Sequence, residues 1–326
     1  MAEQSEHAVC RFRDIGVGTK KEKEKNEMNT PKISLGSWAF SFGPFEKDPW
    51  PFSKVLKYAA DTGYDGIELN GFRPHPHHDD YDTASKCDEL KKEIEGLGLG
   101  ISGYAPDFRE VPPALAETEA YLKTVRKCLF FCEQCGIETL RVDSVSPPEE
   151  MPDDDYEKRF AQLAKTWCAA AEEAARAGVL VVWEFEPGFW LNKPSEVKRV
   201  SEAVNSDNFK LLFDTSHAYM GAVVGARHTG EKEVLGGGVA EYAKLLGEAI
   251  GHLHLIDSDG TLHGDETSTH TPFGDGYIDF KAALSPIKSV VNRMKWWCAD
   301  FCFCAETEAA AKDAVAFMKN LQKEIV

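Results

Sequence analysis

Short apolar runs alternate with amphipathic helical patterns along most of the chain, starting at Ile33. The apolar, often β-branched runs are typical of buried strands, and the segments between them carry apolar residues at the helical spacing of three and four. The pattern predicts strands at 33–38, 65–69, 99–104, 139–143, 179–186, 210–214, 250–256 and 295–302. It predicts helices at 51–62, 82–97, 115–135, 153–177, 194–204, 237–248, 279–289 and 306–324.

Glycines stand where several predicted helices end, as at Gly63, Gly98, Gly136 and Gly178. Glycine is the usual cap there because it adopts a left-handed backbone easily. Eight β-then-α units in one chain predict a parallel sheet, and eight such units close a barrel. We therefore expect an α/β fold of the (β/α)8 TIM-barrel class. An open doubly wound sheet is the alternative, but its GxGxxG turn is missing after the first strand.

The first 31 residues follow a different pattern. They are polar and rich in lysine and glutamate, as in the run 20–25, and they show no apolar periodicity. Such a segment cannot bury enough apolar surface to offset the entropy lost on ordering. We predict a disordered, charged N-terminal tail at 1–31 and a single TIM-barrel catalytic domain at 32–326.

Composition narrows the range of partners. The net charge is −17, from 54 acidic and 37 basic residues, and such a surface repels phosphate backbones, so we predict no nucleic-acid partner. No apolar run approaches ~18 residues, which predicts no membrane span. The charged N-terminus lacks the apolar core of a secretory signal. The cysteines at 128, 132 and 135 share one helix face, which favours buried free thiols and a reducing, cytoplasmic location.

Carboxylates and histidines mark the last four predicted strands. They are Glu184, Glu186, Asp214, His252, His254 and Asp300. Active sites of such barrels lie at the carboxyl ends of the strands, and neighbouring strands are ~4.8 Å apart, so these side chains can converge. A buried carboxylate is costly unless it is paired or binds a metal. Any one acid alone is explained as a helix cap or an ion pair. Four consecutive strand ends favour a metal site, and hard oxygen and nitrogen ligands suit Mn²⁺ first, with Mg²⁺ or Co²⁺ as alternatives.

At these residues the chain resembles the xylose-isomerase-like superfamily of metal-dependent barrels. That superfamily includes ketose 3-epimerases, inosose dehydratases and isomerases, and AP endonucleases. The resemblance covers roughly residues 33–324, and its motifs are Glu184, Asp214-x-x-His217, His252-x-His254 and an acid on the eighth strand. An AP endonuclease needs further zinc ligands, including an Asp-x-His after the seventh strand, and the segment after that strand here lacks this motif.

The resemblance implies that Glu184, Asp214 and His254 hold the metal and that His217 contacts the substrate. The fourth ligand departs from the family pattern, which has glutamate on the last strand. Asp300 occupies the strand position here, and Glu306 stands at the start of the last predicted helix. We predict Asp300 as the fourth ligand.

Further side chains near strand ends are candidates for substrate contact. The predicted substrate-binding residues are His217, Glu186, Arg141, Glu68, His252 and Trp38. Arg141 shares its strand face with Asp143, so the two either pair or bind hydroxyls. The histidines at 75, 77 and 78 are expected to face solvent or substrate rather than a metal. The segment 263–276 is expected to be an active-site loop. Aromatic residues near strand ends stack on a sugar or pack against helices: Trp38, Phe40, Phe185, Phe189 and Trp190.

These features predict a divalent-metal-dependent sugar isomerase or epimerase. It would abstract the proton next to the carbonyl of a ketose or keto-sugar through a metal-stabilised enediolate. Glu184 is the predicted base, and Asp300 or Glu186 the second acid. One alternative is a lyase or dehydratase that eliminates a β-substituent from a keto-sugar, keto-glycoside or inosose. A non-catalytic sugar-binding barrel is an alternative of another class. The sequence leaves open which sugar is bound and whether the chain forms a homo-oligomer.

Overall fold

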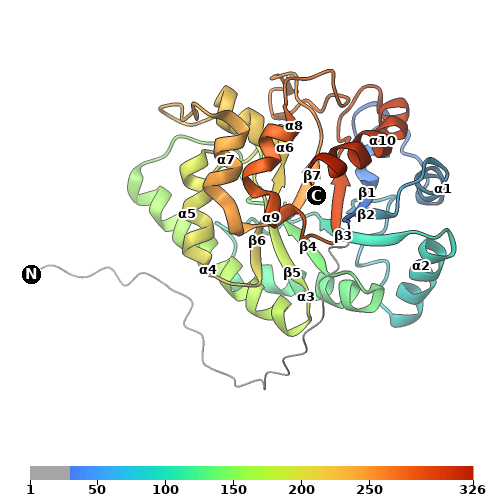
Figure 1. The fold of residues 1–326 in the computed structure, drawn as a ribbon. Helices are drawn as coiled ribbons and strands as arrows, with labels where there is room; N and C mark the ends of the chain where they lie inside the picture. The colour runs from blue at the N-terminus through green and yellow to red at the C-terminus, as the bar shows by residue number, and fades with distance from the viewer. Residues whose placement is uncertain (1–29, 326) are drawn as a thin grey trace, which may run out of the picture.

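A closed barrel of eight parallel strands, wrapped by helices, forms the centre of the computed structural model, which describes residues 30–325 (Figure 1). Around the barrel the order is β1, β10, β7, β6, β5, β4, β3 and β2, so the first and last barrel strands are neighbours. The predicted TIM barrel is confirmed. The predicted N-terminal tail lies almost entirely outside the described residues.

All eight predicted strands are present. They are β1 (Lys32–Gly36), β2 (Gly66–Gly71), β3 (Gly100–Pro106), β4 (Thr139–Val142), β5 (Leu180–Glu184), β6 (Phe209–Asp214), β7 (Ile250–Leu255) and β10 (Trp296–Ala299). Two of them are shorter than predicted by three or more residues. The fifth ends at Glu184, shortly before Pro187, which has no N–H for a ladder hydrogen bond. The eighth ends at Ala299 because Asp300 turns the chain by accepting the N–H of Cys302 at 2.8 Å.

Helices follow the strands and cover the outside of the barrel. They are α1 (Phe52–Thr62), α2 (Ala84–Gly96), α3 (Thr118–Cys135), α4 (Asp153–Arg176), α5 (Pro194–Val204), α6 (Thr215–Tyr219), α7 (Gly238–Leu246), α8 (Phe280–Leu284), α9 (Lys288–Val291) and α10 (Thr307–Ile325). The short α6 was not predicted. The helix predicted at 279–289 is divided into α8 and α9 near Pro286, since proline interrupts helical hydrogen bonding. The predicted loop 263–276 overlaps a small hairpin of β8 (Leu262–His263) and β9 (Thr267–Ser268).

Large apolar side chains fix the helices on the barrel. Trp167 of α4 packs against Trp183 of β5 with ring centroids 5.1 Å apart, and both rings are fully buried. The Trp167 indole donates to the hydroxyl of Tyr121 on α3 at 3.2 Å, which satisfies its polar atom inside the core. Gly63 and Gly136 end α1 and α3 with left-handed backbones, as predicted. None of the helices in residues 30–325 has the length and apolar character needed to cross a membrane.

Candidate active site

Four buried side chains from neighbouring strands converge at the carboxyl end of the barrel. Glu184 ends β5, Asp214 ends β6, His254 lies on β7, and Asp300 directly follows β10. The four contribute ligand-type atoms that all lie within 4.8 Å of one another. Nδ1 of His254 lies 3.0 Å from Oε1 of Glu184 and 3.2 Å from Oδ2 of Asp300. The fold thus brings together the four residues that the sequence grouped as metal ligands; we call them the quartet.

Unpartnered polar atoms show that the quartet suits a cation. Oε1 of Glu184, Oδ2 of Asp214 and Nδ1 of His254 are buried and form no hydrogen bond of good geometry among the described residues, although the first and the last lie 3.0 Å apart. Each such atom costs about 1–3 kcal/mol unless a ligand satisfies it. Burial also raises the pKa of Asp214 to about 7, as expected for a carboxyl that lacks sufficient positive charge nearby. Three carboxylates and one imidazole form a hard donor set, so the residues present fit one divalent metal ion.

Asp214 also caps α6. Its Oδ1 accepts the N–H of His217 at 2.8 Å, and its Oδ2 is left free. The helix cap and the metal ligand, alternatives for this residue in the sequence, are therefore compatible because each uses a different oxygen. The same turn places the His217 imidazole in the pocket above, with Nδ1 held 2.8 Å from Oγ of Ser268. Burial lowers the pKa of His217 to about 3.

A second carboxylate lies behind His254. Glu68 Oε1 lies 3.0 Å from Nε2 of His254, and Glu68 Oε2 lies 2.8 Å from Nε2 of His252. Ser102 donates its hydroxyl to the same Oε2 at 3.2 Å. Glu68 and His252 were predicted as substrate contacts, and this geometry corrects that prediction: both are buried, neither lines the pocket, and the Glu68 oxygens contact His252, His254 and Ser102.

Asp300 is held by three side-chain and backbone groups. Its Oδ1 accepts the Trp38 indole N–H at 2.7 Å and the Cys302 N–H at 2.8 Å, and it lies 3.2 Å from Nδ1 of His270. Burial acts to raise the pKa of Asp300, but the charges and hydrogen bonds of His270 and His254 together outweigh it and hold that pKa well below its usual range. Glu306 is exposed, and its carbonyl accepts the first N–H groups of α10. The fold thus places Asp300, and not Glu306, in the quartet.

Arg141 of β4 joins two acids, Glu184 at the end of β5 and Asp143 directly after β4. Its Nη1 lies 2.6 Å from Oε2 of Glu184, and its Nη2 donates to Oδ2 of Asp143 at 2.8 Å. Burial acts to raise the pKa of Glu184, but the charges of Arg141 and His254 outweigh it and lower that pKa to about 2. Arg141 and Asp143 therefore pair, one of the two outcomes expected from their shared strand face, and the pair keeps Glu184 ionised.

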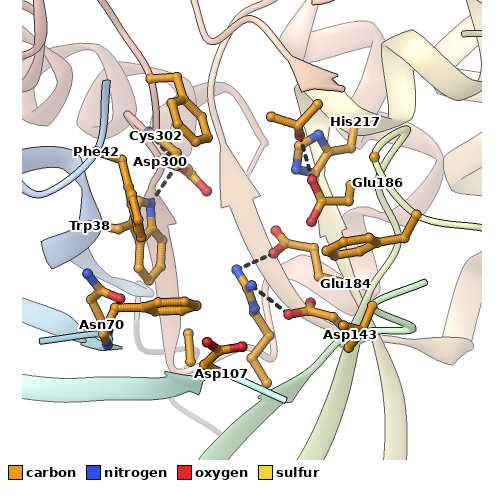
Figure 2. Close-up of a pocket in the computed structure, with 18 of the residues that line it drawn as sticks. Trp38, Phe42, Asn70, Asp107, Asp143, Glu184, Glu186, His217, Asp300 and Cys302 are labelled. Carbon is orange, nitrogen blue, oxygen red and sulfur yellow. Dashed lines mark hydrogen bonds and ion pairs between the residues drawn. The ribbon is translucent and has the colours of Figure 1, made fainter. Parts of the chain in front are cut away.

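A pocket of about 280 Å³ opens above the quartet. Figure 2 shows Glu184 and Asp300 on opposite walls, with Trp38 and Phe42 on the Asp300 side. Of the predicted substrate-binding residues, those that line it are Trp38, Arg141, Glu186 and His217. Glu186 accepts the Thr267 hydroxyl at 2.5 Å, and burial, together with the negative charges of Asp143 and Glu184, raises its pKa to about 8.

The loop between β7 and α8 contributes His270, which the sequence analysis did not single out. His270 is buried and lines the pocket; its Nδ1 lies 3.2 Å from Oδ1 of Asp300, and its Nε2 has no hydrogen-bond partner among the described residues. The available signal was a histidine inside a loop already predicted to be functional. Its position near Asp300 depends on the folding of that loop, which local sequence does not define.

Asp257 anchors this loop. Its Oδ1 accepts the N–H groups of Ser258 and Ile278 at 2.9 and 3.0 Å, and its Oδ2 accepts those of Gly274 and Gly276 at 3.0 and 3.2 Å. A Cβ at Gly276 would lie 2.3 Å from Oδ1, so only glycine lets the backbone come this close. One buried carboxylate therefore ties both ends of the loop together.

The loop histidines after β2 lie outside the pocket. His78 is buried, with Nδ1 2.9 Å from the Tyr104 hydroxyl, and His75 is buried, with Nε2 3.0 Å from the Trp50 carbonyl. The expectation that they face solvent or substrate is wrong for these two, because each packs into the core with a polar partner.

Among the aromatic residues proposed for sugar stacking, Trp38 and Phe189 line the pocket, whereas Phe40, Phe185 and Trp190 belong to the core.

A barrel of this topology with acids and a histidine at its carboxyl end is the architecture of a TIM-barrel enzyme. The sequence profile of the xylose isomerase-like TIM barrel family matches residues 56–321, so the chain belongs to that family. Fructoselysine 3-epimerase of Escherichia coli O157:H7 is 21% identical over 251 residues, which are 73% of this chain and 81% of that enzyme. This kinship confirms the predicted family and the prediction of an enzyme.

Two solved structures have the same fold. A D-tagatose 3-epimerase-like protein matches with a TM-score of 0.66 and 17% identity, covering 90% of this chain and 100% of that one. The IOLI protein, solved with a bound zinc atom, matches with a TM-score of 0.65 and 15% identity, covering 90% of this chain and 99% of that one. At these identities the likeness establishes the barrel fold.

Proposed function

We propose that this chain is a divalent-metal-dependent sugar epimerase or isomerase, which removes the proton next to the carbonyl of a ketose or keto-sugar. The observation that carries the proposal is the convergence of the quartet, with three unpartnered buried atoms, at a pocket large enough for a small molecule. The epimerase activity named for the Escherichia coli relative and the zinc named for the IOLI protein support it.

The quartet residues Glu184, Asp214, His254 and Asp300 would hold one divalent cation, with Mn²⁺ as the first choice and Mg²⁺ or Co²⁺ as alternatives. A cation bound there would polarise the substrate carbonyl and stabilise the negative charge that develops when the neighbouring proton leaves. The protein prepares the ligands in advance: Glu68 orients His254, and Arg141 keeps Glu184 ionised.

Glu184 is the proposed base. It lines the pocket as an ionised carboxylate, and the ion pair with Arg141 fixes the orientation of its carboxyl group. Asp300 stands on the opposite wall, so a proton removed from one face of a substrate carbon by one acid can be returned to the other face by the other. This arrangement of two carboxyl groups is what an epimerisation requires. Glu186 is the alternative second acid, since it lines the same pocket beside Thr267.

Substrate hydroxyls would meet the remaining polar side chains of the pocket. His217 is fixed by Ser268 through one ring nitrogen, which leaves the other edge of its ring for a substrate. Trp38 is fixed through its indole N–H on Asp300 and presents an aromatic face. These groups position a sugar without taking part in the proton transfer.

Solvent deuterium exchange tests the proposal directly. The metal-loaded protein is incubated in D₂O with a panel of ketohexoses, inososes and 3-keto-glycosides, and deuterium uptake is followed by NMR. Uptake at the carbon next to the carbonyl is expected, and the product then distinguishes epimerisation, isomerisation and elimination. Absence of uptake across the panel by protein that carries about one metal ion per chain would contradict the proposal.

A further inference from the structure

The mouth of the pocket is walled by aromatic rings. Four half-buried phenylalanines line it, and they come from the segments that follow β1, β2, β5 and β10: Phe42, Phe72, Phe189 and Phe303. We call these residues the phenylalanine collar. Apolar surface that gathers at the rim of a cavity marks a binding site, because exposed aromatic rings are otherwise unfavourable in water.

Three rings of the collar form one wall. The Phe42 ring centroid lies 5.4 Å from that of Phe72, edge to face, and 5.7 Å from that of Phe303. Phe189 has no aromatic partner within residues 30–325, and its loop follows β5, which is four places from β1 around the barrel of eight strands. The fourth ring therefore stands across the pocket from the other three, as a flat ligand between two walls would require.

The backbone holds this collar in place. A Cβ at Gly43 would lie 2.9 Å from Cα of Phe303, so the segment after β1 packs directly on the segment after β10. Phe303 itself has a left-handed backbone with φ of 59°, and Val145, which also lines the pocket, has φ of 66°. Such conformations are unfavourable for residues with a Cβ, and they are found where a site is built for a ligand.

Polar groups at the mouth are already satisfied within the protein. Asp107 accepts the Arg109 guanidinium through Nε at 3.0 Å and Nη2 at 2.7 Å. Asn70 donates to Oγ of Ser41 at 2.7 Å and accepts the N–H of Phe72 at 3.2 Å. The floor, in contrast, keeps unpartnered atoms on the quartet. Unpartnered polar atoms therefore lie on the quartet at the floor, whereas at the mouth the polar groups of Asp107, Arg109 and Asn70 are paired and the phenylalanine rings supply the apolar surface.

We infer that the substrate is a keto-sugar that carries a flat apolar group, such as the aryl group of a glycoside, on the side away from the reacting carbonyl. The sugar half of this inference rests on the proposed function: the floor binds the keto-sugar and the phenylalanine collar binds the apolar group. A free ketose is polar over its whole surface and would leave the rings in contact with water.

A pair of matched substrates tests the binding of the apolar group separately from the binding of the keto-sugar. The metal-loaded protein is assayed by deuterium exchange with the methyl and phenyl glycosides of one 3-ketohexose, which differ only in the apolar group. The phenyl glycoside is expected to have a kcat/KM about 10- to 100-fold higher, the discrimination that apolar contacts usually give. Phe189→Ala and Phe72→Ala should each reduce this ratio towards one. Phe130→Ala, on the exposed face of α3, is the matched control and should leave the ratio unchanged.

Equal kcat/KM values for the two glycosides would overturn the inference while leaving the proposed function intact. A loss in Phe189→Ala that is the same for both glycosides would also overturn it, because the ring would then contact the sugar itself. If neither glycoside exchanges, the wider deuterium-exchange panel decides the proposed function, and calorimetric affinities of methyl and phenyl glucoside for the same protein decide the inference. Tighter binding of phenyl glucoside that is lost in Phe189→Ala supports a site for an apolar group, and equal affinities contradict it.

Discussion

Glu68 and His254 are joined across the barrel floor, with Oε1 of the carboxylate 3.0 Å from Nε2 of the imidazole. The other ring nitrogen of His254 faces Glu184 and Asp300. With a metal bound, a carboxylate on one nitrogen would fix the histidine tautomer in which the other nitrogen is free to coordinate the ion. The sequence placed Glu68 among substrate contacts, whereas the fold gives it the task of orienting His254.

Replacing the Glu68 carboxylate should lower the metal affinity of the quartet without removing a ligand. We expect Glu68→Gln to lower metal affinity about 10- to 100-fold, the usual effect of losing such an orienting partner. Competition with a fluorescent chelator measures the change. Ser102→Ala, which removes only the hydroxyl bound to the other Glu68 oxygen, is the control and should have a smaller effect. Unchanged affinity in Glu68→Gln would show that His254 does not depend on Glu68.

Substitutions of two acids that lie close together in the sequence, Asp300 and Glu306, test which of them is the fourth metal ligand. Asp300→Ala should reduce the metal content of the purified protein, because Asp300 lies in the quartet. Glu306→Ala should retain about one metal ion per chain, because Glu306 is exposed at the start of α10. Elemental analysis of both variants gives the answer. Full occupancy in Asp300→Ala with loss in Glu306→Ala would move the ligand to Glu306.

Glu184, which ends β5, and Glu186, two residues further on, should differ in their effects on the reaction. Glu184→Gln retains one oxygen but cannot accept a proton, so we expect a loss of about 10² to 10⁴ in rate, the usual contribution of a positioned base. Glu186→Gln should cost much less if Glu186 only binds Thr267 and the substrate. Deuterium exchange and metal content are measured together. Exchange abolished in Glu186→Gln, with only weakened metal binding in Glu184→Gln, would reverse the two roles.

Asp257 should control the order of the active-site loop. Asp257→Asn keeps the shape, but its amide group would face two backbone N–H donors, a mismatch of about 1–3 kcal/mol. We expect faster hydrogen exchange at 258–278 and lower turnover, with the metal content unchanged because the quartet lies outside this loop. Asp259→Asn is the control, since within residues 30–325 Asp259 accepts hydrogen bonds only from Thr261. Hydrogen exchange equal to that of the control would exclude the anchoring role.

Removing the metal should lower stability. A ligand that binds only the folded state stabilises it by about 2.7 kcal/mol at 100 times its Kd, and the buried acids of the quartet would lose their counter-charge on chelation. We therefore expect the melting temperature to fall on treatment with a chelator and to recover with added Mn²⁺. Calorimetry with and without the chelator checks this. An unchanged melting temperature in protein shown to have lost its metal would contradict it.

The sequence by itself determined the barrel and most of the quartet. Strand and helix periodicities depend on neighbouring residues, so eight repeats could be counted before any contact was known. Glu184 and Asp214 end their strands and His254 lies on the next, and parallel strands of one barrel bring such positions to the same rim.

Only the tertiary structure decided which polar side chains orient the quartet residues and which line the pocket. Glu68 contacts His252 and His254, which are 184 and 186 residues further along the sequence. The sequence pattern predicts that Glu68 points into the barrel, but it cannot tell whether the carboxylate then orients a histidine or contacts a substrate. Asp300 joins the quartet because β10 ends at Ala299, and His270 approaches Asp300 because Asp257 closes its loop. These outcomes depend on hydrogen bonds between distant segments, which local pattern does not encode.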